Sequence, residues 1–118
     1  MSDQENSSDI VNLRELKEIM DDDMELIADC FAEFINDWPE LHSEIKHAIS
    51  GKDARILNAA AHKLKGTLRY LAADPAAEAA FALEAAGKGN DWDGIDAMLE
   101  ELESQCQQLI EYINHFKA

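Results

Sequence analysis

The sequence predicts an all-α protein, an antiparallel four-helix bundle with a short N-terminal lid helix. Apolar residues recur in steps of three and four along most of the chain, and no stretch shows the alternation of a half-buried strand. The 118 residues include only two prolines and five glycines, and 47% of them are hydrophobic. A chain of this size can bury one sizeable core. We therefore expect a single domain over residues 10–118, after a polar, disordered tail over residues 1–9.

The first two predicted helices begin at capping signals. Asn12 and Asp22 each precede a glutamate by three residues, which is the capping-box pattern. The helix after Asn12 is too short to be stable alone and should lie across the bundle. The helix after Asp22 is long, and its apolar register continues across Pro39, which favours one kinked helix over two. Gly51 is expected to end it in a left-handed conformation.

Breaks in the sequence separate the three remaining helices. Asp53 caps a third helix that runs to about Ala73. A fourth helix, rich in alanine, begins at a proline and covers about residues 75–86. The glycine-rich segment 87–90 is expected to form a turn, after which Asp91 caps the last helix.

The third helix carries a histidine on its polar face. With Leu57 at zero on a helical wheel, Leu64 and Leu68 lie within about 20° and mark the buried stripe. His62 lies about 140° from that stripe, so we expect an exposed imidazole. Five of the ten Lys and Arg residues of this chain, whose net charge is −15, fall in the segment 52–69 with a single acid, a local charge of +4. These cations are Lys52, Arg55, Lys63, Lys65 and Arg69.

Gly66 is unusual in this setting, because a glycine inside an exposed helix costs about 1 kcal/mol relative to alanine. A helix side chain leans over the residue four positions before it, so Gly66 leaves one flank of His62 bare. Lys65 can reach over the same ring. The combination suggests that a large partner approaches the imidazole. It also suggests that the imidazole has to carry negative charge. The alternative is a surface histidine beside a glycine that packs closely against another helix.

The segment His62–Thr67, HKLKGT, resembles the histidine phosphotransfer (HPt) domain pattern. That pattern is roughly H-x-L-K-G followed by two small residues, then Gly-Ala, then Leu-Glu in the next helix. Leu68 replaces a small residue and Ala72 replaces the usual glycine, and both are compatible with helix packing. The order of the predicted helices fits the family over nearly the whole chain. The matching positions are His62, Leu64, Lys65, Gly66, Thr67, Ala73, Leu83 and Glu84.

The resemblance implies a phosphorelay intermediate in two-component signalling. His62 would accept a phosphoryl group, on Nε2, from the aspartyl phosphate of one receiver domain and pass it to another. Lys65 and Arg69 would stabilise the phosphoryl charge, and Gly66 would give clearance. An apolar rim from the first two helices would dock the receiver domains of hybrid sensor kinases and response regulators. The chain would need no cofactor or metal, since the Mg²⁺ would sit in the receiver. No ATP-binding motif is present, so a phosphocarrier is expected and not a kinase.

Composition and charge argue against several classes of function. The acidic balance disfavours binding to nucleic acid or to anionic membranes. No apolar run is long enough to span a membrane, and no secretory leader is evident, so we expect a cytoplasmic protein. Cys30 and Cys106 are expected to be buried thiols and not a disulfide or a metal pair. A monomer is expected, with a dimer left open.

Two rival classes remain. The first is a bundle that binds a signalling partner as an adaptor without phosphotransfer. The second is a metal protein, because helical bundles can hold di-metal sites through paired Glu-x-x-His motifs. Only Glu44-x-x-His47 occurs, and His47 points outward, as does His115. His42 lies at the edge of an apolar stripe without an evident partner. The metal reading is therefore disfavoured.

Overall fold

The computed structural model describes residues 10–116, and within that range it contains five α-helices and no strand. The prediction of an all-α protein is confirmed. The tail predicted over residues 1–9 lies outside the described residues. No helix in the described part of the chain is both long and apolar enough to cross a membrane. The helices are α2 (Leu13–Ile19), α3 (Met24–Ser50), α4 (Ala54–Tyr70), α5 (Asp74–Gly89) and α6 (Ile95–Asn114).

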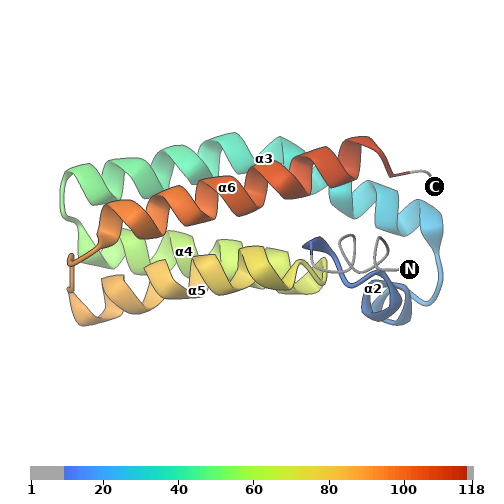
Figure 1. Ribbon diagram of the computed structural model, residues 1–118, viewed down its shortest axis with the longest axis horizontal. Coiled ribbons are helices and arrows are strands. Elements are labelled where there is room, and N and C mark those ends of the chain that lie inside the picture. The colour runs from blue at the N-terminus through green and yellow to red at the C-terminus, as the bar shows by residue number, and fades with distance from the viewer. Residues whose placement is uncertain (1–9, 117–118) are drawn as a thin grey trace.

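The four long helices run lengthwise beside one another, each in the direction opposite to the one before it (Figure 1). Contacts join α3 to both α4 and α6, and they join α5 to both α4 and α6. The short helix α2 lies at one end, beside the start of α3. This arrangement leaves one long side of α4 open to solvent, between α3 and α5.

A single apolar cluster fills the space between the helices. The predicted stripe of α4 is confirmed, since Leu57, Leu64 and Leu68 are all 0% exposed. Burial of one large apolar side chain stabilises a fold by about 1.5–3 kcal/mol. The stripe of α3 continues across Pro39, as predicted, and consists of Ile27, Phe31, Phe34, Trp38, Leu41, Ile45 and Ala48.

Two of the predicted helix caps form as expected. The side chain of Asn12 accepts a hydrogen bond from the Glu15 amide at 3.1 Å, and that of Asp53 accepts one from the Ile56 amide at 3.1 Å. Such caps contribute about 1 kcal/mol each. The helix α3 continues through Pro39 as one element, in agreement with its unbroken apolar register.

Two other predicted helix ends are wrong by one residue. The N-cap of α3 is Asp23 and not Asp22, and its carboxylate accepts from the Leu26 amide at 3.0 Å. Asp22 instead has a left-handed backbone, with φ of 59°. At the other end of α3 the left-handed residue is Lys52, with φ of 53°, while Gly51 has φ of −93°. Before α3, three consecutive aspartates could each act as the cap, so the sequence does not decide which of them does.

The fourth helix is longer than predicted, because α5 continues to Gly89 and Asn90 takes the left-handed position with φ of 52°. The segment 87–90 is therefore not a turn. Gly87 is a buried helical residue at a close approach to α4. A Cβ at this position would lie 2.7 Å from the Asn58 amide nitrogen and 2.9 Å from the Ala54 carbonyl oxygen. Only glycine fits such a spacing.

The last helix begins later than predicted. Asp91 does not cap it; its carboxylate accepts from the Asp93 amide at 3.1 Å within the preceding loop. The N-cap of α6 is Gly94, whose φ of 70° favours glycine. The connection between α5 and α6 therefore covers residues 90–94 and not 87–91.

The junction between α4 and α5 also ties α2 to the other helices. The helix α4 ends at Tyr70 and not near Ala73. Ala72, at the position where the HPt pattern has glycine, has a left-handed φ of 55°. The carbonyl oxygen of Ala72 accepts a hydrogen bond from the Asn12 amide at 2.9 Å, which fixes the start of α2 against this junction.

Candidate functional site

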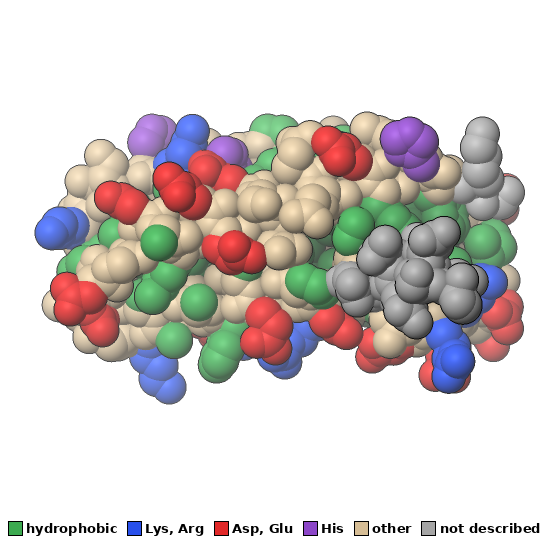
Figure 2. Space-filling model, viewed as in Figure 1, with side chains coloured by type: hydrophobic (Ala, Val, Ile, Leu, Met, Phe, Trp, Pro, Cys, Tyr) green, Lys and Arg blue, Asp and Glu red, His purple; other side chains and the backbone are tan. Residues whose placement is uncertain are grey.

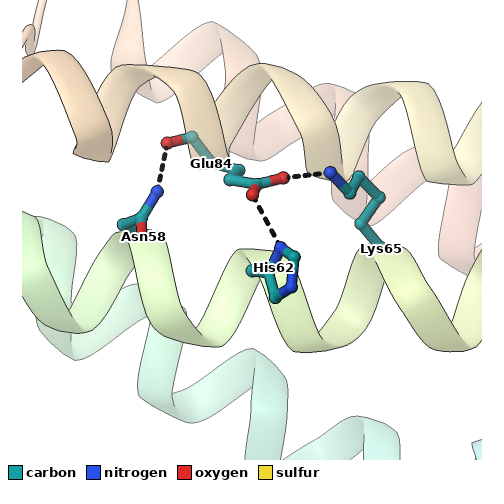
Figure 3. A network of polar contacts seen from close by, with 4 residues as sticks. All are labelled: Asn58, His62, Lys65 and Glu84. Atoms are coloured by element: carbon teal, nitrogen blue, oxygen red, sulfur yellow. Dashed lines mark hydrogen bonds and ion pairs between the residues drawn. The ribbon is translucent and has the colours of Figure 1, made fainter.

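His62 projects from the open side of α4, and its side chain is 68% exposed. Its Nδ1 lies 2.7 Å from Oε2 of Glu84, which comes from α5 (Figure 3). An ionised carboxylate can only accept a hydrogen bond, so in the neutral ring Nδ1 carries the proton and donates it to Glu84. The lone pair is then on Nε2, at the edge of the ring turned away from Glu84.

Glu84 joins His62 to a lysine. Oε1 of Glu84 lies 2.6 Å from Nζ of Lys65, and each of these two side chains is 16% exposed. The Lys65 ammonium, and to a lesser degree the His62 ring, hold the pKa of the Glu84 carboxyl below its usual range, against the opposing effect of desolvation. The carboxylate is therefore ionised at neutral pH, as the hydrogen bond to Nδ1 requires.

A further hydrogen bond connects α4 to the backbone of α5 at Glu84. Nδ2 of Asn58 donates to the carbonyl oxygen of Glu84 at 2.9 Å (Figure 3). Asn58 is in turn one of the residues that Gly87 approaches closely. The distance between α4 and α5 is thus set within one turn of Glu84, which places its carboxylate within reach of His62.

The expectation that Lys65 is exposed over the imidazole is wrong. Its ammonium turns toward α5, where it also lies 5.0 Å from the centre of the Phe81 ring. Its spacing of three residues from His62 predicts that Lys65 can reach over the ring, but it gives no information about the neighbouring helix. The sequence singles out Glu84 only as part of the HPt pattern and predicts none of its contacts.

Gly66 does not pack against another helix. It is exposed, and a Cβ at this position would meet nothing within 4 Å. It borders a groove of about 360 Å³ between α3 and α4, whose walls include Tyr70 on α4 and Glu33 and Asp37 on α3. Space for a partner therefore exists on the flank of His62 that Gly66 leaves open.

Three of the four predicted cations on α4 remain on its surface, and Lys65 is the exception. Arg55, Lys63 and Arg69 are all exposed. On the α5–α6 side of the molecule, by contrast, acidic side chains are spread over the surface and the Lys and Arg side chains lie along its margins (Figure 2). The positive charge of this acidic chain is thus concentrated around the helix that carries His62.

The other histidines do not form a comparable site. His42 has a partner that the sequence did not reveal, since its Nε2 lies 2.7 Å from Oε2 of Glu103. Its ring stacks on Trp38, with centres 4.6 Å apart. His47 and His115 are exposed, as predicted. Among residues 10–116 no three His, Cys, Asp or Glu side chains are grouped as metal ligands.

Both cysteines are free thiols. Cys106 is buried, and desolvation raises its pKa to about 12. Cys30 is only partly buried, in the groove beside Gly66. Its pKa is also raised, mainly by desolvation and further by Glu33 and Asp29. Neither thiol is activated as a nucleophile.

Comparison with known protein families gives a match over most of the chain. A family model described as "Hpt domain" matches residues 29–112, which is more than two thirds of the chain. The matched range runs from α3 into α6 and contains His62, Lys65, Gly66 and Glu84. Searches among curated proteins and among solved structures found no match.

Proposed function

The chain belongs to the Hpt domain family, and on this premise we propose that it is a phosphorelay intermediate that carries a phosphoryl group on His62. The group would come from the aspartyl phosphate of one receiver domain and pass to the aspartate of another. The observation that supports this most strongly is the state of His62, which is exposed and held by Glu84 through Nδ1 alone. Hpt domains are helical phosphocarrier modules, so the protein would carry the phosphoryl group without ATP-dependent kinase activity of its own.

The geometry supports attack by Nε2. In the proposed step the Nε2 lone pair forms a bond to phosphorus, the bond from phosphorus to the aspartyl oxygen breaks, and the receiver carboxylate leaves with the electron pair. Nδ1 keeps its proton and its hydrogen bond to Glu84, so the phosphorylated ring carries a positive charge opposite that carboxylate. The reverse step delivers the group to the next receiver. The Mg²⁺ belongs to the receiver, where the acidic residues that bind it lie.

We further propose that the receiver covers His62, Gly66 and the adjoining groove. Two exposed apolar side chains would supply the apolar rim. Tyr70, 53% exposed, lines that groove, and Leu26, 40% exposed, lines a neighbouring hollow that shares Cys30 and Glu33 with it. In this proposal α3 to α6 form an antiparallel four-helix bundle, and α2 is a lid at the end of it. The protein would act as a cytoplasmic monomer.

The direct test is incubation with phosphorylated receiver domains from the source organism. Transfer of label to this protein, followed by its loss to a second receiver, is the expected result. Stable binding of a receiver without any transfer of label would instead identify an adaptor.

Arg69 is proposed to offset the charge of the phosphoryl group and of the receiver's acidic site. Arg69→Glu should slow phosphotransfer by about tenfold or more, because it reverses a charge beside the approach path. Stability should change by less than about 0.5 kcal/mol, since the side chain is exposed. Lys46→Glu, an exposed reversal outside the segment 52–69, is the matched control. Equal rates for both variants would show that the charge on α4 has no role in transfer.

Gly66 is proposed to give the receiver clearance. Gly66→Gln should leave the protein at least as heat-stable as the parent, because an exposed helical glycine is replaced by a better helix former. The new side chain leans back toward His62, so transfer should fall by about tenfold or more. Thermal unfolding and the transfer rate are measured on the same sample. A stable variant that transfers at the parent rate would show that the partner approaches from another side.

A further inference from the structure

Lys65 is enclosed by α5 and is not presented beside the free edge of His62. Its Nζ lies 2.6 Å from Oε1 of Glu84 and 5.0 Å from the centre of the Phe81 ring. Its side chain is 16% exposed, whereas that of His62 is 68% exposed. Ion pairing and cation–π attraction both hold the ammonium in this place. Lys65 is therefore a fixed charge behind the imidazole.

The carboxylate of Glu84 is shared between these two residues. One oxygen accepts from Nδ1 of His62 and the other pairs with Lys65. Figure 3 shows both side chains reaching the same carboxylate, with the second ring nitrogen of His62 turned away from it. To contact a phosphoryl group on that nitrogen, Lys65 would have to leave both of its partners on α5. A mostly enclosed carboxylate would then have lost its cation, while the phosphoryl group adds negative charge nearby.

From this geometry we infer that Lys65 is a positioning residue that acts on His62 through Glu84, by neutralising and anchoring the carboxylate, and does not contact the phosphoryl group. The inference deepens the proposed function and takes from it only the identity of the reacting histidine. Without its cation, Glu84 repels an incoming phosphoryl group and is free to move away from Nδ1. With the Lys65 ammonium in place, Nδ1 stays protonated and the lone pair of Nε2 stays available to bond to phosphorus. Lys65 should therefore matter only while residue 84 carries a negative charge.

A double-mutant cycle distinguishes this role from direct contact. Lys65→Met keeps the aliphatic stem and removes the charge. Glu84→Gln keeps an oxygen that can accept from Nδ1 and removes the charge. The phosphoryl donor is phosphoramidate: its P–N bond breaks, ammonia leaves, and phosphorus bonds to Nε2. Labelling is followed on the NMR signals of the His62 ring. Because no receiver takes part, the result does not depend on whether the protein acts in a phosphorelay.

We expect Lys65→Met to slow labelling by about tenfold in the parent and by less than about twofold in the Glu84→Gln background. Lys65→Arg, which keeps the ion pair, should restore most of the rate. The ¹⁵N shifts of the ring should report protonation of Nδ1 in the parent and a mixture of tautomers in Lys65→Met. Equal slowing of labelling in both backgrounds would place Lys65 on the phosphoryl group and overturn the inference. If Lys65→Met slows labelling in neither background, the inference is overturned as well. If Lys65→Met does not fold, Lys65→Gln serves in the same cycle.

Discussion

His62→Gln is expected to abolish phosphoryl transfer from a phosphorylated receiver domain and to leave the helical content unchanged. The amide of glutamine offers no nucleophile comparable to the imidazole lone pair on Nε2. The side chain of His62 is 68% exposed, so its replacement removes no core contact. Transfer of ³²P label and the far-ultraviolet circular dichroism spectrum, measured together, separate loss of the acceptor from loss of the fold.

Two other histidines provide matched controls for this experiment. His47 and His115 are exposed on α3 and at the end of α6, so His47→Gln and His115→Gln should transfer at the parent rate. Undiminished, acid-labile label on His62→Gln would assign the acceptor to one of the remaining histidines. The assignment of His62 would then be wrong.

Gly87→Ala is expected to destabilise the protein strongly, while the same change at Gly66 should stabilise it. Both positions gain about 1 kcal/mol of helix propensity. At Gly87 the new methyl group would lie within 3.0 Å of backbone atoms of Asn58 and Ala54, so the two helices must separate. Overpacking of this kind costs about 1–3 kcal/mol or more. Because the close contacts are with backbone atoms, we take the upper figure and expect a net loss of about 2 kcal/mol at Gly87 and a gain of up to about 1 kcal/mol at Gly66.

Thermal unfolding of the two alanine variants measures this contrast directly. A difference of about 3 kcal/mol corresponds to roughly 12 °C between their melting temperatures in a domain of this size. Each variant is the control for the other, since the chemical change is the same and only the surroundings differ. Similar melting temperatures would show that α4 and α5 can move apart at little cost.

The fold could be predicted well from the sequence because its main signal is local. Steps of three and four identified the buried stripes of the long helices, and side chains such as Asn12 and Asp53 act as caps through their own backbone neighbours. Helix ends were less certain where several residues offered the same signal. Three consecutive aspartates precede α3, and choosing among Asp21, Asp22 and Asp23 depends on how the chain turns out of α2.

The glycines illustrate what a local signal leaves undecided. Gly66 and Gly87 both lie inside helices, yet one faces open space and the other faces the backbone of α4. Periodicity on one helix defines which residues point inward, but it does not say how closely the next helix approaches. For this reason the sequence alone predicts a turn at Gly87, although this residue sets the spacing of α4 and α5.

The site was predictable in its central residue and not in its partners. The wheel placed His62 on the exposed face correctly. The spacing of Lys65 predicts a side chain over that ring instead, because the ion pair with Glu84 depends on a residue from another helix. The same limit applies to His42, whose partner Glu103 lies on α6. Contacts between helices require their relative rotation, which the sequence pattern of a single helix does not contain.

The hydrogen bonds that hold His62 and Glu84 in place have a consequence for how the protein folds. They join residues 22 and 26 positions apart, all within the hairpin of α4 and α5. The His42–Glu103 contact, by comparison, spans 61 positions. Because the entropy lost on closing a loop grows with its length, and short-range contacts form fastest, the hairpin is expected to assemble early. The arrangement around His62 can then be complete before the C-terminal helix docks.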